Sequence, residues 1–191
     1  MKKFLLMAAV LLTTMAANAQ NTVGKFTIAP TVGINFSNVS GDVDDNKMKV
    51  GAVFGAVAEY GLLEKLGLSA GVLYSMQGYK EEYSSYGSTE KSTTKLNYLN
   101  VPILANYYVI KGLAVKAGLQ PAFLLSAKNE DYDIKDHCKT FELSIPVGAS
   151  YEFKNFQLDA RYNIPLTKYN DGDGSTKNSV FQLTLGYKIG L

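Results

Sequence analysis

The chain has 191 residues with 19 Lys and Arg against 17 Asp and Glu, and it combines 13 Tyr and 9 Phe with no Trp. This length suits one domain, the near-neutral charge lacks the basic stripe that nucleic acid selects, and the single Cys138 excludes an internal disulfide. Beyond the N-terminal segment, no apolar run is long enough to cross a bilayer as a helix. Nucleic-acid binding, a disulfide scaffold and helical membrane spans are therefore excluded.

The N-terminal segment has the three parts of a secretory signal peptide. Two lysines follow the initiating Met, an apolar run covers 4–12, and an Ala-Asn-Ala cleavage site ends at Ala19. An N-terminal anchor helix is the alternative, but this apolar run is too short to span a bilayer. We therefore predict a signal peptide over 1–19, cleavage before Gln20, and one domain over 20–191 with 17 basic and 17 acidic residues.

Eight segments of the remaining chain carry apolar residues at every second position, which is the period of a β-strand. Each is about as long as a tilted strand that crosses a membrane. The segments are 25–37, 50–60, 66–77, 98–109, 113–123, 141–153, 156–167 and 181–191.

The connections between these segments alternate in length, which is typical of membrane barrels with tight turns at one end and long loops at the other. The pattern predicts an all-β fold, a single up-and-down antiparallel transmembrane β-barrel of about eight strands after a cleavable signal peptide. The short connections are 61–65, 110–112 and 154–155, and the long polar ones are 38–49, 78–94, 127–140 and 168–178.

The composition of the two strand faces separates a membrane barrel from a soluble sandwich or lipocalin-like barrel, in which the apolar face points inward. Here the second face is rich in Gly, Ser, Thr, Asn and Gln and carries few charges, whereas a water-facing surface normally carries many Lys and Glu. Aromatic residues also gather toward the strand ends of the apolar face, as in interfacial girdles. We therefore expect the apolar face to meet outer-membrane lipid.

A small set of charged residues falls on the second face and is expected inside the barrel. Because side chains fill the interior of a small barrel and buried charges must be paired, we interpret the set as a salt-bridged structural plug. A proton or ion path is the alternative reading. The expected pairs are Lys25 with Glu59, Lys116 with Glu152, and Asp159 with Lys188, and the full set is Lys25, Glu59, Lys116, Glu142, Glu152, Asp159, Arg161 and Lys188.

The chain has no motif that predicts catalysis or a cofactor. His137, the only histidine, lies beside Cys138 in a long connection, which we expect to be a solvent-exposed loop because a metal or nucleophile site needs further partners. The acidic run 170–174 lacks the spacing of a calcium-binding loop. We therefore predict no enzyme activity, no catalytic residues, no metal and no cofactor.

Seven stretches carry a recognisable pattern: KLNYLNVPIL at 95–104, YYV at 107–109, GL at 112–113, GINFS at 33–37, LYSMQG at 73–78, DARYN at 159–163 and FQLTLGY at 181–187. Together they resemble the PorT-type outer-membrane β-barrel family of Bacteroidota over nearly the whole mature chain. The resemblance implies a barrel inserted by the outer-membrane assembly machinery and located in the cell outer membrane, with a link to secretion machinery.

The C-terminus resembles a barrel-assembly signal, with Thr184 and Gly186 followed by hydrophobic Ile189 and Leu191. The usual last residue of that signal is aromatic, which Leu191 is not. Function remains open among three hypotheses: a structural or partner-binding barrel that acts through its long loops, a small transport or channel barrel, and a soluble secreted ligand-binding barrel. The narrow, filled interior of an eight-stranded barrel favours the first.

Overall fold

The structure is a computed structural model that describes residues 23–40, 46–85, 88–129, 132–168 and 177–191. The predicted signal peptide and its cleavage point between Ala19 and Gln20 lie outside these residues. In the parts of the chain that are described, no helix is long and apolar enough to cross a membrane.

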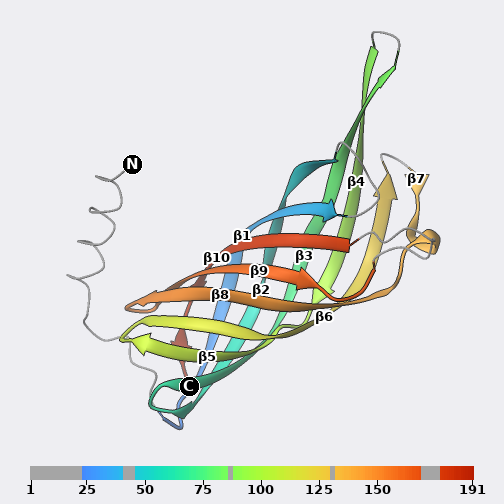
Figure 1. Cartoon of the computed structure of the whole chain (residues 1–191). Coiled ribbons are helices and arrows are strands. Elements are labelled where there is room, and N and C mark those ends of the chain that lie inside the picture. The colour runs from blue at the N-terminus through green and yellow to red at the C-terminus, as the bar shows by residue number, and fades with distance from the viewer. Residues whose placement is uncertain (1–22, 41–45, 86–87, 130–131, 169–176) are drawn as a thin grey trace, which may run out of the picture.

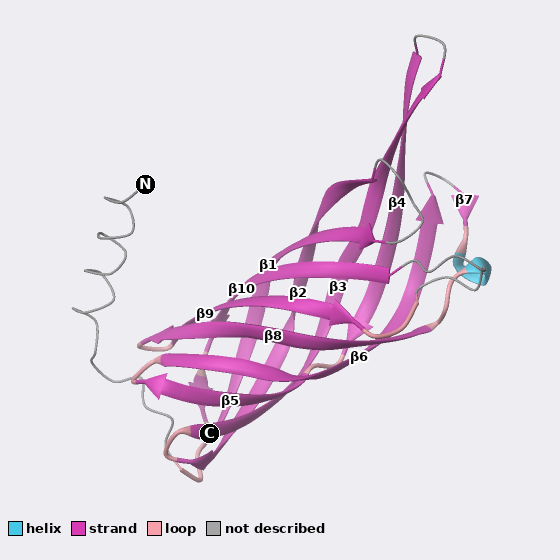
Figure 2. Ribbon diagram, viewed as in Figure 1, coloured by secondary structure: helices cyan, strands magenta, loops and turns pink. Residues whose placement is uncertain are grey.

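The described chain forms one antiparallel sheet with a single turn of 3₁₀ helix, η1 (Lys135–His137) (Figure 2). The strands are β1 (Phe26–Ser40), β2 (Asn46–Leu63), β3 (Leu66–Ser85), β4 (Ser88–Asn100), β5 (Ile103–Ile110), β6 (Leu113–Asn129), β7 (Tyr132–Asp133), β8 (Phe141–Phe153), β9 (Phe156–Pro165), β10 (Lys177–Tyr187) and β11 (Ile189–Gly190).

The sheet closes on itself as a barrel because β1 pairs with β2 on one side and with β10 on the other (Figure 1). β4 and β5 share one position of the ring, between β3 and β6, and β10 and β11 share another beside β1. The ring therefore has eight strand positions, and the predicted fold class is confirmed. A closed ring leaves no unpaired sheet edge, which is what a lipid environment requires.

Burial alternates along the strands in the phase that the sequence predicts. On β3, for example, Val72 is 54% exposed while the next residue, Leu73, is fully buried. Apolar side chains such as Phe54 and Leu158 cover the outside, and neutral polar ones such as Asn35 fill the inside. In a soluble barrel the exposed face would be the polar one, so the outward apolar band is the surface that meets lipid.

Inward-facing glycines allow the strands to coil tightly around the narrow interior. A Cβ atom on Gly33 or Gly148 would lie 2.1 Å from a carbonyl oxygen of the neighbouring strand, that of Leu183 or Ala160 respectively. No side chain fits at such a distance. The predicted face of small residues is therefore a steric requirement of the barrel.

The two ends of the barrel differ as expected. Tight turns join β2 to β3, β5 to β6 and β8 to β9 at one end, and two of them use left-handed backbone, with φ of +81° at Gly112 and +54° at Lys154. The longer connections all lie at the other end, called the loop end below (Figure 1). Parts of the connections at this end, 41–45, 86–87, 130–131 and 169–176, are outside the described residues.

Two predicted boundaries were wrong. The connection expected over 78–94 is largely strand: β3 and β4 stay paired up to Ser85 and Ser88, because backbone hydrogen bonds form a ribbon without any apolar alternation. The strand expected over 98–109 is interrupted at Pro102, which lacks an amide hydrogen. There the Val101 N–H donates to the Pro121 carbonyl instead, at 2.8 Å.

Candidate functional site in the barrel lumen

Charged side chains from five parts of the ring meet inside the barrel near the tight turns. Glu59 is on β2, Lys116 on β6 and Glu152 on β8, and all three are buried. Asp159 and Arg161 are both buried on β9, where a spacing of two places them on the same face. The last member is Lys188, between β10 and β11. We call these six residues the ionic cluster.

One half of the ionic cluster holds two carboxylates around a single ammonium group. Lys188 Nζ lies 2.7 Å from Glu152 Oε1 and 3.4 Å from Glu59 Oε2. The Tyr108 hydroxyl lies 2.5 Å from Glu59 Oε1 and 2.6 Å from Glu152 Oε1. The cation and the hydroxyl together hold the two acids side by side, which would otherwise repel each other.

The other half holds one carboxylate between two cations. Asp159 lies 2.8 Å from Lys116 Nζ and 2.7 Å from Arg161 Nε. Gly148 is the register partner of both cations, and its missing side chain leaves the space in which the Arg161 side chain packs. Gln157 links the two halves, because its amide donates to Glu152 at 2.8 Å and its oxygen accepts from Lys116 at 3.5 Å.

The ionic cluster contains three acids and three bases, so its formal charge is balanced. Buried charges are tolerated when they are paired and hydrogen-bonded, and every member here has at least one ion pair. The ion-paired side chains of the cluster occupy the lumen at the end where the tight turns are.

The loop end of the lumen beside β3, β4 and β6 is closed by apolar side chains instead. They form one buried cluster, which the partly buried Ile134 packs against from the segment between β6 and β8. That segment is fixed by backbone hydrogen bonds from Ile134 to Ala127 and from Cys138 to Lys135, both 3.0 Å. We call this the apolar cluster, and it contains Tyr79, Leu96, Tyr98, Ala122, Leu124, Ala127 and Cys138.

On the side of β1, β2, β3 and β10, mainly neutral polar groups occupy the lumen, together with Lys49, whose Nζ donates to the Gln77 carbonyl at 2.6 Å. The Asn35 amide donates to Ser75 Oγ at 2.9 Å and to the Met76 carbonyl at 3.0 Å. Nearer the loop end, the Asn178 amide donates to Gln77 Oε1 at 2.6 Å. The bonds of Asn35 and Asn178 join strands that are not adjacent but lie two or three positions apart in the ring, so they tie non-neighbouring strands together.

The ion pairs differ from those expected from the sequence. Lys116 pairs with Asp159 and not with Glu152, and Lys188 pairs with the two glutamates and not with Asp159. Lys25 precedes β1 and its side chain is exposed, and Glu59 is paired instead by Lys188, which lies on the other side of β1. Hairpin neighbours were the wrong guide, because these long side chains reach past the adjacent strand to the next one in the ring.

Other predicted residues lie apart from the ionic cluster. Glu142 is buried nearer the loop end, where it accepts a hydrogen bond from the Tyr98 hydroxyl. Thr184 and Gly186 of the C-terminal pattern are buried in β10, while Ile189 and Leu191 are exposed.

Cys138 was expected in a solvent-exposed loop and is instead buried in the apolar cluster, because η1 folds its segment back over the strands. Only the backbone of His137 is described, as the last residue of η1. In the described residues, no group of three or more His, Cys, Asp or Glu side chains could hold a metal ion. The acidic run 170–174 lies outside them.

The tyrosines of the lumen were not predicted from the sequence. Tyr98 and Tyr108 bind the carboxylates of Glu142 and of Glu59 with Glu152. Their signal was present, since both fall on the inward face of the segment 98–109, between positions whose apolar side chains face outward. A bulky phenol on a face of otherwise small residues indicates a buried hydroxyl with a partner.

A closed eight-position ring with an apolar outer band, a polar filled interior and loops gathered at one end defines a small outer-membrane β-barrel. The chain belongs to the family described as "Outer membrane protein beta-barrel domain", whose sequence model matches residues 18–171. The predicted location in the outer membrane is therefore confirmed, and a soluble secreted barrel is excluded.

Several solved structures have a similar fold. Neisserial surface protein A has a TM-score of 0.56 at 16% identity, over 86% of this chain and 97% of that one. Ail, the attachment invasion locus protein of Yersinia pestis, gives 0.50 at 16% identity in the crystal, over 88% and 100%. In a phospholipid bilayer nanodisc Ail gives 0.52 at 17%, over 87% and 99%. At these identities the likenesses concern the fold alone. Among curated proteins nothing matches.

Proposed function

We propose that this chain is a non-enzymatic outer-membrane barrel that serves as a structural anchor and presents its loop end to a protein partner. The observation that carries the proposal is the filled lumen. The ionic cluster occupies it at the turn end, and the apolar cluster occupies it beside β3, β4 and β6 at the loop end. An interior of this kind supports the wall of the barrel and leaves recognition to the loops.

The ribbon of β3 and β4 is the part of the loop end best suited to contact a partner. β3 has 20 residues, whereas a strand of about 9–11 residues crosses the membrane. The pairing with β4 continues to the tip, so the ribbon projects beyond the other strands (Figure 1). A paired ribbon outside the bilayer offers a preformed surface at little cost in chain entropy.

Crosslinking in native membranes tests partner binding. A photoreactive amino acid replaces Lys80 at the base of the ribbon, and the matched control replaces Lys65 in the opposite turn, which is also exposed. We expect a discrete crosslinked protein from position 80 and none from position 65. If position 80 yields only lipid adducts in cells that express all native partners, the partner-binding role is wrong.

A channel remains the second candidate function, because the lumen of this barrel is polar over much of its length. Conductance of the purified protein in a planar bilayer decides between the two functions. The filled lumen predicts no stable conductance steps. Regular conductance steps that disappear when the protein is unfolded would show that the protein is a channel and would contradict the anchor function.

We also propose that the chain belongs to the PorT-type family and is linked to secretion machinery, because the stretches at 95–104 and 181–187 resemble that family. The first of them forms the junction of β4 and β5, where Pro102 interrupts the strand. Affinity isolation of the tagged chain from its native membrane tests the link. Secretion components should be recovered with the tagged chain. Their absence under conditions that preserve such complexes would contradict the proposed link.

Export and assembly complete the proposal. Cleavage after Ala19 predicts a mature protein that begins at Gln20, which intact mass spectrometry measures directly. Insertion by the assembly machinery through Thr184, Gly186, Ile189 and Leu191 predicts that removal of Leu191 lowers the folded yield in membranes. An unchanged yield would show that this C-terminal pattern is not the signal.

A further inference from the structure

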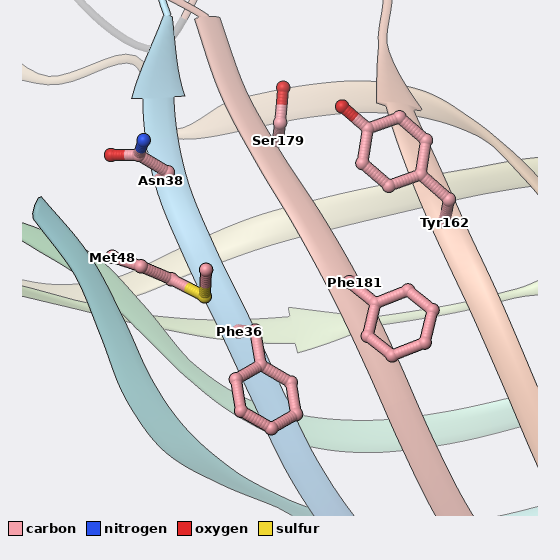
Figure 3. Close-up of a pocket in the computed structure, with 6 residues that line it drawn as sticks. All are labelled: Phe36, Asn38, Met48, Tyr162, Ser179 and Phe181. Atoms are coloured by element: carbon pink, nitrogen blue, oxygen red, sulfur yellow. The ribbon is translucent and has the colours of Figure 1, made fainter. Parts of the chain in front are cut away.

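A groove lies on the outer surface of the barrel where the first and last long strands meet (Figure 3). Its volume is about 520 Å³, and it is open along one side. It lies toward the loop end on the lipid-facing side of the wall. Its lining comes from β1, β2, β9 and β10 and consists of Phe36, Asn38, Met48, Tyr162, Ser179 and Phe181.

The strand register explains why a groove forms here. Asn38 on β1 is the direct partner of Ser179 on β10, and both are short. One step closer to the membrane centre, Phe36 and Phe181 are also partners, with ring centroids 6.1 Å apart. Tyr162 stands beside Phe181 on β9. Two short polar residues above a pair of rings therefore leave a hollow with an apolar floor and a polar upper rim.

A cation stands just above the polar rim. Lys177 is two residues before Ser179 on β10, so it lies on the same outer face about 7 Å closer to the loops. Its strand partner on β1 is the uncharged Ser40. From the membrane outward, the wall therefore presents aromatic rings, then an amide and a hydroxyl, then an ammonium group. That order matches acyl chain, ester or sugar region, and anionic headgroup.

We propose that this groove binds one anionic, phosphate-bearing lipid of the outer leaflet. An acyl chain packs on Phe36 and Phe181, Asn38 and Ser179 contact the glycerol or sugar region, and Lys177 pairs with the phosphate. A lipid is the expected occupant, because the protein lies in the outer membrane and the groove faces the bilayer. Headgroup charge is the selective element, since basic side chains at the membrane surface attract anionic lipid.

The opposite wall supplies a matched control. There Asn97 on β4 is the partner of Ser126 on β6, and its amide donates to Ser126 Oγ at 2.9 Å. Lys128 is two residues further along β6 on the same outer face and is exposed. The same three residue types thus occur on the other side of the ring.

The test uses the full-length protein in phosphatidylcholine bilayers that contain a minor fraction of photoreactive phosphatidylglycerol. We expect adducts on peptides that contain Met48 or Phe181. Ser179→Trp, which fills the groove, should abolish these adducts, and Lys177→Gln should lower them about fivefold, as expected for one lysine at a membrane surface. Ser126→Trp and Lys128→Gln should leave them unchanged.

Three results would overturn the proposal. Equal labelling by a photoreactive phosphatidylcholine would mean that the groove does not select charge. Equal losses with Lys128→Gln would mean that general attraction to the surface explains the labelling. Unchanged labelling in a Ser179→Trp protein that shows the far-ultraviolet circular dichroism of the native barrel would mean that the lipid does not enter the groove.

Discussion

The side chains inside the two ends of the lumen are held by different kinds of interaction. At the turn end, six charged side chains from β2, β6, β8, β9 and the β10–β11 junction are bound by ion pairs of 2.7–3.4 Å. At the loop end beside β3, β4 and β6, the contacts are apolar. Ion pairs depend on every partner being present, whereas apolar packing tolerates changes that keep volume. The turn end should therefore be the more sensitive to single substitutions.

The largest effect should come from removing the acid that both cations share. Asp159→Ala leaves Lys116 and Arg161 without their counter-ion inside the lumen, and we expect a loss of about 4 kcal/mol in the free energy of unfolding. Urea unfolding in lipid vesicles, followed by far-ultraviolet circular dichroism, measures it. The control is Glu64→Ala in the exposed β2–β3 turn, with an expected change within about 0.5 kcal/mol. Equal losses in the two variants would contradict an essential ionic cluster.

A comparable deletion at the loop end should cost less. Leu96 is fully buried in the apolar cluster, and Leu96→Ala removes packing and leaves a cavity, with an expected loss of about 3 kcal/mol. Leu96→Met keeps most of the volume and should cost less than about 1.5 kcal/mol. The same unfolding measurement applies. If methionine were as damaging as alanine, the loop end would not be held by tolerant apolar packing.

Much of the fold was predictable from alternation alone. A period of two assigns Asn35 and Glu59 to the inside and Phe54 to the outside, and the alternating loop lengths predict which end carries the tight turns. The predicted β-barrel, its eight positions and its location all follow from these two patterns. Both patterns are visible in short stretches of sequence, so the fold could be predicted without knowing the tertiary contacts.

The partners inside the lumen could not be predicted in the same way. Which acid Lys188 reaches depends on the stagger of the strands around the ring, and its side chain reaches past β1 to Glu59 on β2. The fold of η1 over the wall, which buries Cys138, depends on tertiary contacts that no local pattern encodes. The ribbon of β3 and β4 was overlooked because backbone pairing needs no apolar alternation.

The tyrosine that contacts the ionic cluster should have an intermediate effect. Tyr108→Phe removes the hydroxyl that lies between Glu59 and Glu152, and we expect a loss of about 2 kcal/mol, because a hydrogen bond to a charged group is lost inside the lumen. The adjacent Tyr107 faces lipid, so Tyr107→Phe is the matched control. Unfolding midpoints of the two variants give the comparison, and coincident midpoints would mean that Lys188 alone holds the two acids together.

The smallest effect should come from the one predicted lumen acid that lies toward the loop end. In the described chain Glu142 makes no ion pair, and its recorded partner is the Tyr98 hydroxyl. Glu142→Gln keeps the shape and an oxygen acceptor for that hydroxyl, so we expect a change below about 1 kcal/mol. Asp159→Asn is the same exchange at the turn end, where it removes the negative charge between two cations and should cost several times more. Unfolding of both variants in the same vesicles measures the difference, and a larger loss for Glu142→Gln would mean that charge also matters at the loop end.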